Sequence, residues 1–134
     1  MTWAEYLQGA EFLARSFNGI VPMDGVRVQR LSIYGHTQQI EFVFDFASFP
    51  PNLWDKGKYD TLQATFVFAP FRLIKVDRWM YSQFDGHPYC DVNLTKVDGG
   101  FRALFHGDVD MEILCEAVGV KKLVPYLRSE TPIL

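Results

Sequence analysis

The sequence predicts one mainly β domain of the α+β kind: an antiparallel sheet or β-sandwich-like meander with one short N-terminal helical segment. Two observations lead to this prediction. Several runs alternate large apolar and polar residues with a period of two, as strands with one buried face do. The 134 residues also include 12 Phe, six Tyr and three Trp, and aromatic side chains favour strands. A chain of this length fits a single domain, residues 1–134.

The first segment, residues 1–19, is expected to be helical. Thr2 and Glu5 have the spacing of a capping box. Apolar residues recur at intervals of three to four positions at Trp3, Leu7, Ala10, Ala14 and Phe17. Gly9 leaves open a division into two short helical pieces, and the pair Asn18-Gly19 is typical of a helix end.

The predicted antiparallel β core spans residues 26–126. Its first strand covers Val26 to Tyr34, where two valines are out of phase with the later apolar residues. A one-residue bulge near Gln29 or Arg30 would bring both sets to one face. The short connection at residues 35–37 predicts a hairpin with the next strand.

That next strand, residues 38–46, is the clearest in the chain. One face would carry four large apolar residues, Ile40, Phe42, Phe44 and Phe46. Burial of each contributes roughly 1.5–3 kcal/mol. The outward face would carry Gln39, Glu41, Val43 and Asp45. We therefore expect a strand with one dry face and two acidic residues on the other.

A long loop follows at residues 47–60. Pro50-Pro51 forbids a continuing ladder. We expect its apolar residues to cover one end of the sheet, with a binding loop as the alternative; these residues are Phe49, Leu53, Trp54 and Tyr59.

The remaining strands are expected to form a meander. Residues 61–71 repeat the central pattern, residues 72–81 alternate less cleanly after Pro70, and Asp85-Gly86 has the composition of a hairpin turn. A second turn at residues 98–100 joins two further strands. Residues 110–124 suit either a helix or a strand, and their valines and Gly119 favour strands. Pro125 ends the pattern, and residues 127–134 are interpreted as a tail.

Composition limits the compartment and the partners. The formal net charge is −3, without the clustered Lys and Arg of a nucleic-acid-binding face. There is no apolar run of about 18 residues, and the N-terminus carries acids where a signal peptide carries bases. The prediction is a cytoplasmic protein without nucleic-acid or membrane partners. Cys90 and Cys115 are then expected to be free, buried thiols, with a disulfide between them as the alternative.

We find no pattern that predicts catalysis. His106, Asp108 and Asp110 would share one face of a strand and are ligand types for metals, but a polar turn is the interpretation we favour. His87 and Cys90 are three residues apart, so in a strand they would point to opposite faces. His36 and His87 lie in turns and are expected to face solvent. No catalytic residue, metal or cofactor is predicted, and the chain is not expected to be an enzyme.

Several segments together resemble the Immunity-protein-fifty family of bacterial polymorphic-toxin immunity proteins. They extend from about Gly9 to Tyr126: GAEFLARSFNG followed by VP, LSIYG, IEFVFDF, the P-x-x-W pattern at residues 51–54 with Tyr59-Asp60 after it, LQATFVF and CEAVGVKKLVPY. The resemblance implies a protein that binds a cognate toxin domain and neutralises it by occlusion, without catalysis. It implies no catalytic residues.

Three residues are candidates for contact with such a partner. Glu41 and Asp45 share the outward face of the central strand, and Trp54 lies in the neighbouring loop. Acidic patches suit basic partners, and Trp is favoured in interface hot spots. Two other classes stay open: a small-ligand-binding or enzymatic β domain of unknown substrate, and an adaptor that uses an exposed sheet edge.

Overall fold

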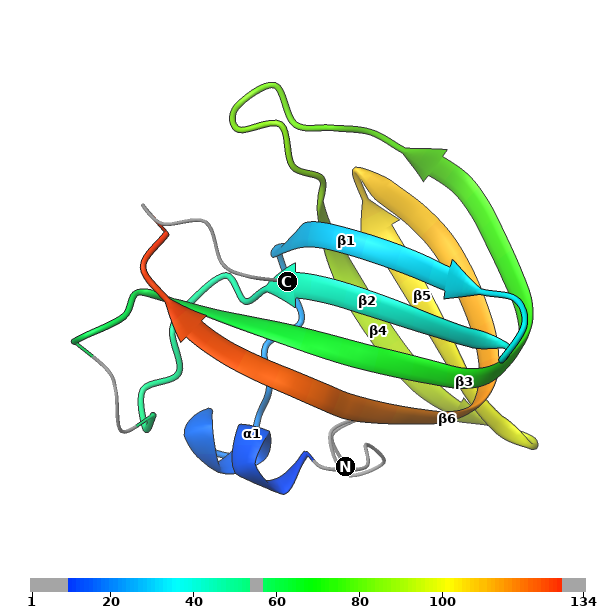
Figure 1. Cartoon of the computed structure of the whole chain (residues 1–134), viewed down its shortest axis with the longest axis horizontal. Helices are drawn as coiled ribbons and strands as arrows, with labels where there is room; N and C mark the ends of the chain where they lie inside the picture. The colour runs from blue at the N-terminus through cyan, green and yellow to red at the C-terminus, as the bar shows by residue number, and fades with distance from the viewer. Residues whose placement is uncertain (1–9, 54–56, 129–134) are drawn as a thin grey trace.

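The structure is a computed structural model that describes residues 10–53 and 57–128. Within these residues it contains one helix and six strands (Figure 1). Their bounds are α1 Glu11–Ser16, β1 Val26–Tyr34, β2 Gln39–Asp45, β3 Thr61–Trp79, β4 Tyr89–Val97, β5 Gly100–Gly107 and β6 Val109–Tyr126. The prediction of a mainly β protein with antiparallel strands is confirmed.

The six strands close into a barrel in the order β1-β2-β3-β6-β5-β4, with every neighbouring pair antiparallel. Two three-stranded meanders are joined along a long ladder between β3 and β6, and both strands bend strongly (Figure 1). The closing seam between β1 and β4 is short and pairs only Val26 with Cys90 and Arg27 with Tyr89. The sheet therefore closes on itself instead of forming a sandwich.

The predicted hairpin of β1 and β2 is confirmed, together with its bulge. The register shifts between Val28 and Arg30. Without the shift, the apolar residues on the two sides of the bulge would face opposite ways. With it, Val28 pairs with Phe44 and Leu31 pairs with Phe42, so both apolar residues of β1 lie on the core side.

The middle of the chain differs from the expected meander at two points. Residues 61–71 and the less regular residues after them form a single strand, because β3 runs through Pro70 to Trp79. The β3–β6 register passes over Pro70, which has no N–H to donate, and the amide of Phe71 donates to the carbonyl of Gln38 at 2.8 Å. Asp85-Gly86 lies in a turn, but β3 pairs with β2 and β6 while β4 pairs with β1 and β5. The predicted hairpin across this turn is therefore absent.

The C-terminal segment and the helix follow the predictions more closely. Residues 110–124 lie in a strand, β6, which continues past Pro125 to Tyr126. Pro125 itself is opposite Leu62.

The described part of the predicted N-terminal segment contains α1, followed by Asn18 and Gly19 with positive φ. The predictions for residues 1–9 and for the tail from residue 129 lie outside the described residues.

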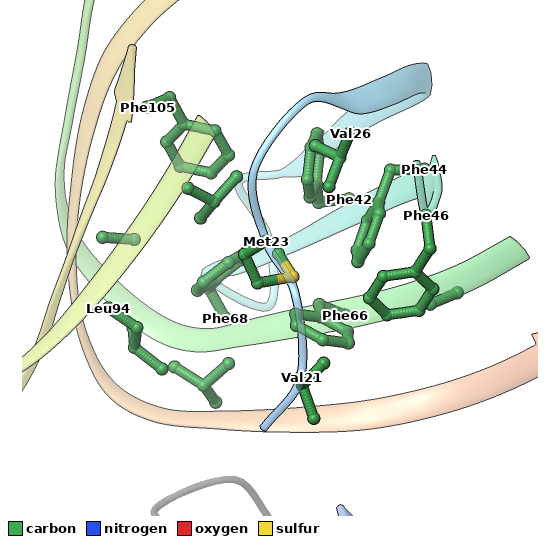
Figure 2. Packing of buried hydrophobic residues seen from close by; sticks show 14 of the residues in the cluster. Val21, Met23, Val26, Phe42, Phe44, Phe46, Phe66, Phe68, Leu94 and Phe105 are labelled. Atoms are coloured by element: carbon green, nitrogen blue, oxygen red, sulfur yellow. The ribbon is translucent and has the colours of Figure 1, made fainter. Parts of the chain in front are cut away.

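Aromatic rings fill the barrel (Figure 2). The ring centre of Phe44 lies 5.0 Å from that of Phe42 and 4.9 Å from that of Phe66. Helix α1 packs against the same core through Leu13. Directly after the helix, the ring centre of Phe17 lies 4.9 Å from that of Phe46. A hollow lined by Met23, Phe66, Phe68, Val92, Leu94 and Val118 measures only about 10 Å³, about the smallest space that holds one water molecule. The core is therefore packed solid at this point.

The loop before β3 covers the core as expected. Leu53 is buried in the core and Phe49 packs against it. The free thiols of Cys90 and Cys115 are also buried, as the sequence predicted. No helix in the described ranges has the length and apolar character needed to cross a membrane.

Candidate functional site

The three predicted partner-binding residues are not presented as the sequence suggested. Glu41 and Asp45 share one face of β2, but their exposed fractions are only 6% and 0%. The expected accessible pair of acids is therefore wrong, because Lys121 of β6 pairs with Glu41, and donors from β1 and β6 converge on Asp45. Trp54 lies outside the described residues. Contact of these residues with a partner stays a prediction.

Glu41 forms an ion pair with the end of the barrel's last strand. The Lys121 Nζ lies 2.9 Å from one carboxylate oxygen and 3.2 Å from the other. Beside the pair is a hollow of about 160 Å³, whose charged residues are three cations and one acid, Arg30, Lys121, Lys122 and Glu41. This part of the outer surface is basic where the sequence predicted an acidic patch.

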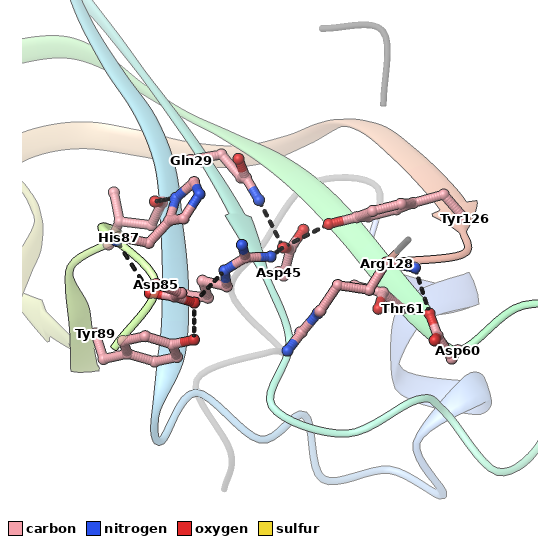
Figure 3. Close-up of polar contacts among 11 residues, drawn as sticks. Gln29, Asp45, Asp60, Thr61, Asp85, His87, Tyr89, Tyr126 and Arg128 are labelled. Atoms are coloured by element: carbon pink, nitrogen blue, oxygen red, sulfur yellow. Dashed lines mark hydrogen bonds and ion pairs between the residues drawn. The ribbon is translucent and has the colours of Figure 1, made fainter. Parts of the chain in front are cut away.

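Asp45 is held by three donors on one oxygen (Figure 3). Its Oδ2 accepts hydrogen bonds from the Tyr126 hydroxyl at 2.6 Å and the Gln29 amide at 2.7 Å, and Arg27 Nη1 lies 3.3 Å away. Burial and the Asp45 carboxylate together raise the pKa of Tyr126 above its ordinary value. A buried carboxylate requires such donors. Asp45 therefore fastens β2 to β1 and β6.

Asp85 extends this network to the loop before β4. Its Oδ2 lies 3.0 Å from Arg27 Nε and accepts the Tyr89 hydroxyl at 2.5 Å, while the His87 amide donates to Oδ1 at 3.0 Å. Burial raises the pKa of the Asp85 carboxyl, but these hydrogen bonds and the Arg27 charge outweigh burial and bring the pKa below 3.8. Burial and Asp85 also raise the pKa of Tyr89. We call Arg27, Gln29, Asp45, Asp85, Tyr89 and Tyr126 the seam cluster.

Beyond this cluster the edge of β1 is open. The amide of Val28 donates to the Pro88 carbonyl at 2.8 Å, and the Val28 carbonyl is 3.1 Å from His87 Nδ1. His87 is thus half-buried, which differs from the solvent-facing position expected for it, while His36 is exposed as predicted. Within the ranges 10–53 and 57–128, no strand pairs with β1 on this side after Arg27.

A cleft of about 340 Å³ lies along this open edge. Its lining residues are Val28, Gln29, Arg30, Leu31, Trp79, Tyr81, Gly86, His87 and Pro88. One wall is β1, and the other is the end of β3 with the loop of residues 80–88. We call it the β1 cleft. Residues of the β1 edge and the aromatic residues Trp79 and Tyr81 thus line the same hollow.

Exposed apolar side chains lie beside both walls. On the loop, Phe84 is 93% exposed, Tyr81 is 66% exposed and Met80 is also exposed; on β1, Ile33 is 52% exposed. Grouped apolar side chains on a surface indicate an interaction site. The alternating pattern of residues 72–81 places Tyr81 in a strand and gives no sign of this surface. The signal for it in the sequence is Phe84, a large apolar residue directly before the turn dipeptide Asp85-Gly86.

The polar residues that the sequence offered as metal ligands form ion pairs and hydrogen bonds within the protein. Asp110 lies 2.8 Å from Arg78 and 3.2 Å from His106, and Asp108 accepts the Tyr89 amide at 3.0 Å. In the part of the chain that the structure describes, no group of three or more His, Cys, Asp and Glu could hold a metal ion. Burial, with nearby acids, raises the pKa of Cys90 to about 12, so its thiol stays protonated at neutral pH.

Comparisons of the chain with protein-family models, with curated proteins and with solved structures find no match. The geometry alone therefore defines the class: a small closed antiparallel barrel with a packed core, an open strand edge and an aromatic loop beside it.

Proposed function

We propose that this protein is a non-catalytic immunity protein that acts in the cytoplasm. It binds the cognate toxin domain of a bacterial polymorphic-toxin system and neutralises it by occlusion. The observation that carries the binding role is the exposed apolar surface at the β1 cleft, above all Phe84 and Tyr81. Large aromatic side chains are typical anchors of protein interfaces. The toxin as partner follows from the resemblance of the sequence segments described above.

Occlusion requires a surface that keeps its shape. The loop of residues 80–88 is tied to the rest of the barrel at both ends: the Met80 amide donates to the Asp108 carbonyl at 2.8 Å, and the Val28 amide of β1 donates to the Pro88 carbonyl at 2.8 Å. Between these bonds, Asp85 meets Arg27 and Tyr89. Because these contacts fix the loop, its backbone loses little conformational freedom on binding. A specific complex would bury about 1,200–2,000 Å² in total.

Glu41 and Asp45 are poor positions for testing where the toxin docks. Glu41 is paired and Asp45 is buried in the seam cluster. Changing Asp45 to Lys would place a cation beside Arg27 in a buried site and unfold the protein. Variants of these two acids therefore do not separate binding from folding, whereas variants of the exposed loop do.

The test is protection from the toxin encoded beside this protein's gene. Co-expression of wild-type protein should restore growth, and calorimetry should show a complex. The double variant Tyr81→Ser with Phe84→Asp should keep its melting temperature, since both side chains are exposed, but should lose protection. Ile20→Asp is the matched control, because Ile20 is an exposed apolar residue near α1, and it should protect fully.

Two results would contradict the proposal. One is failure of the wild-type protein to protect against that toxin or to bind it. The other is full protection by a folded Tyr81→Ser, Phe84→Asp variant, which would remove the loop from the interface.

A further inference from the structure

We infer that the open edge of β1 receives an extended segment of the partner as an added strand, in which apolar and acidic residues alternate. The apolar side chains enter the β1 cleft, and the acidic ones lie beside Arg30. This inference rests on the proposed function for the protein nature of the partner, and it names how that partner is recognised.

The backbone of β1 offers unpaired groups at this edge. In a strand, the N–H and C=O of one residue point to the same side, and successive residues alternate. The Val28 amide bonds to Pro88, on the side away from β2. After the bulge, Arg30 pairs with Val43 and Leu31 with Phe42. The amide of Phe46 donates to the Leu62 carbonyl of β3 at 3.1 Å, so by alternation Glu41 and Val43 direct their backbone groups toward β1. Their partners Ser32 and Arg30 bond to β2, and the N–H and C=O of Leu31 and Ile33 therefore point away from β2.

Strand β4 does not reach these groups. The amide of Val92, two residues after the last β1–β4 pair, donates to the Met23 carbonyl at 2.9 Å, before β1 begins. Among the residues that the structure describes, the backbone groups of Leu31 and Ile33 have no partner on this edge. Main-chain hydrogen bonds to such an edge give an added peptide much of its affinity.

The side chains above the edge are apolar. Leu31 and Ile33 lie opposite Phe42 and Ile40, which are core residues, so both point to the inner face. Across the opening, Trp79 is opposite the buried Val109 and also points inward. Ile33 is half exposed although it faces inward. Alternate apolar side chains of an added strand would cover it and fill the β1 cleft.

The charges near this edge indicate which residues suit the outward-facing, alternate positions of the added strand. Arg30 lies on the outer face, is exposed and has no ion-pair partner in ranges 10–53 and 57–128. No Asp or Glu lines the β1 cleft, while Arg30 and His87 do. A second copy of this chain suits the edge poorly, because β1 carries Arg27 and Arg30 and no acid. Acidic residues at alternate positions of a foreign strand would complement it.

The experiment uses a capped hexapeptide in which valine and glutamate alternate, added to the isotopically labelled full chain and followed by NMR and amide hydrogen exchange. The amides of Leu31 and Ile33 should exchange fast in the free protein and become protected with the peptide. The lysine analogue of the peptide should bind at least about tenfold more weakly, as should the glutamate peptide to Arg30→Glu. Lys58→Glu carries the same charge change in the loop before β3 and should bind normally.

Ile33→Pro tests the backbone contact. It removes an N–H that points away from β2, a position where an edge strand tolerates proline, and should abolish peptide binding. Ile33→Ala keeps the N–H and should retain binding, although more weakly. If Ile33→Pro does not fold, the protection of the two wild-type amides decides alone. Absence of that protection at 1 mM peptide (about 4 kcal/mol of binding free energy) overturns the inference, as do equal binding of the lysine analogue and a dimer whose β1 amides are already protected.

Failure of this inference is distinguishable from failure of the proposed function. If the wild-type protein protects against the toxin and folded Ile33→Pro protects equally, the added strand is wrong and the immunity function stands. If the peptide binds as described but no toxin is neutralised, the edge site stands and the immunity function is wrong.

Discussion

The carboxylate of Asp45 is fully buried, yet three donors converge on its Oδ2 while Oδ1 has no hydrogen-bond partner. A charge in such a place is stable only while its donors remain, because a buried unpaired charge costs several kcal/mol. The donors come from β1 and from Tyr126 at the end of β6, strands that do not pair with each other. One side chain thereby connects three strands.

Removing one of these donors should be costly. Tyr126→Phe deletes a hydroxyl that donates to Asp45 at 2.6 Å, and a hydrogen bond to a charged group contributes roughly 1.5–3 kcal/mol. We expect the free energy of unfolding, measured by urea denaturation, to fall by about that amount. Tyr34→Phe removes the hydroxyl of an exposed tyrosine and should change it by less than about 0.5 kcal/mol. Equal values for the two variants would show that the Asp45 contact contributes nothing.

Phe44 and Phe84 form a matched pair of aromatic residues, one fully buried and one almost fully exposed. Phe44→Asp would place a carboxylate among the rings of Phe42, Phe46 and Phe66. The penalty of several kcal/mol is comparable with a total stability of about 5–15 kcal/mol. We expect loss of the cooperative thermal transition in Phe44→Asp and an unchanged one in Phe84→Asp. A wild-type transition in Phe44→Asp would place Phe44 outside the core.

At the scale of elements, the β4–β5 hairpin depends on a close approach of backbones. Its turn at residues 98–100 follows the prediction from Asp98-Gly99-Gly100, and Val97 pairs with Gly100. A Cβ at Gly100 would lie 2.1 Å from the Cys115 carbonyl oxygen of β6, and φ there is +155°. The hairpin can therefore pack on β6 only with glycine at this position.

Gly100→Ala should destabilise the protein by roughly 1–3 kcal/mol or more, because backbone atoms of β6 would have to move. Gly35→Ala is the control, since no heavy atom lies within 4 Å of its added Cβ and its φ is not positive. That variant should be neutral or more stable by about 0.4–1 kcal/mol. Thermal unfolding of both variants gives the comparison, and a Gly100→Ala protein as stable as Gly35→Ala would refute the close approach.

At the scale of the whole molecule, the barrel is held unevenly. The β3–β6 ladder runs the length of both strands, whereas β1 and β4 pair at two positions only. The seam cluster supplements this short closure with side chains from β1, β2, β4 and β6. The barrel can therefore close at one end of β1 and leave the other end of that strand with an open edge.

The two buried thiols should make the folded protein less stable as the pH becomes alkaline. Burial raises the pKa of Cys90 from 9.0 to about 12 and that of Cys115 to about 11. Above pH 9 the unfolded chain loses these protons while the folded chain keeps them, so stability falls as pH rises from about 9 toward 11–12. Urea denaturation between pH 8 and 10 should show this fall in wild type and a flatter curve in Cys90→Ala, Cys115→Ala. Parallel curves would assign the fall to other groups.

The sequence by itself determined what depends on neighbours along the chain. Alternation predicted the strands and the apolar face of β2, the phase change predicted the bulge between Val28 and Arg30, and turn residues predicted the β1–β2 and β4–β5 hairpins. These features depend on side-chain period and on turn chemistry, which short stretches encode.

Only the tertiary structure decided which distant strands meet. Pro70 interrupts a local pattern, but β6 pairs with β3 on both sides of it. Glu41 and Asp45 look solvated from their alternation, but Lys121 and Tyr126 reach them from 80 and 81 residues away. The open edge of β1 exists because β4 leaves β1 after Arg27. Barrel closure is a sum of such long-range pairings, and no local period specifies their partners.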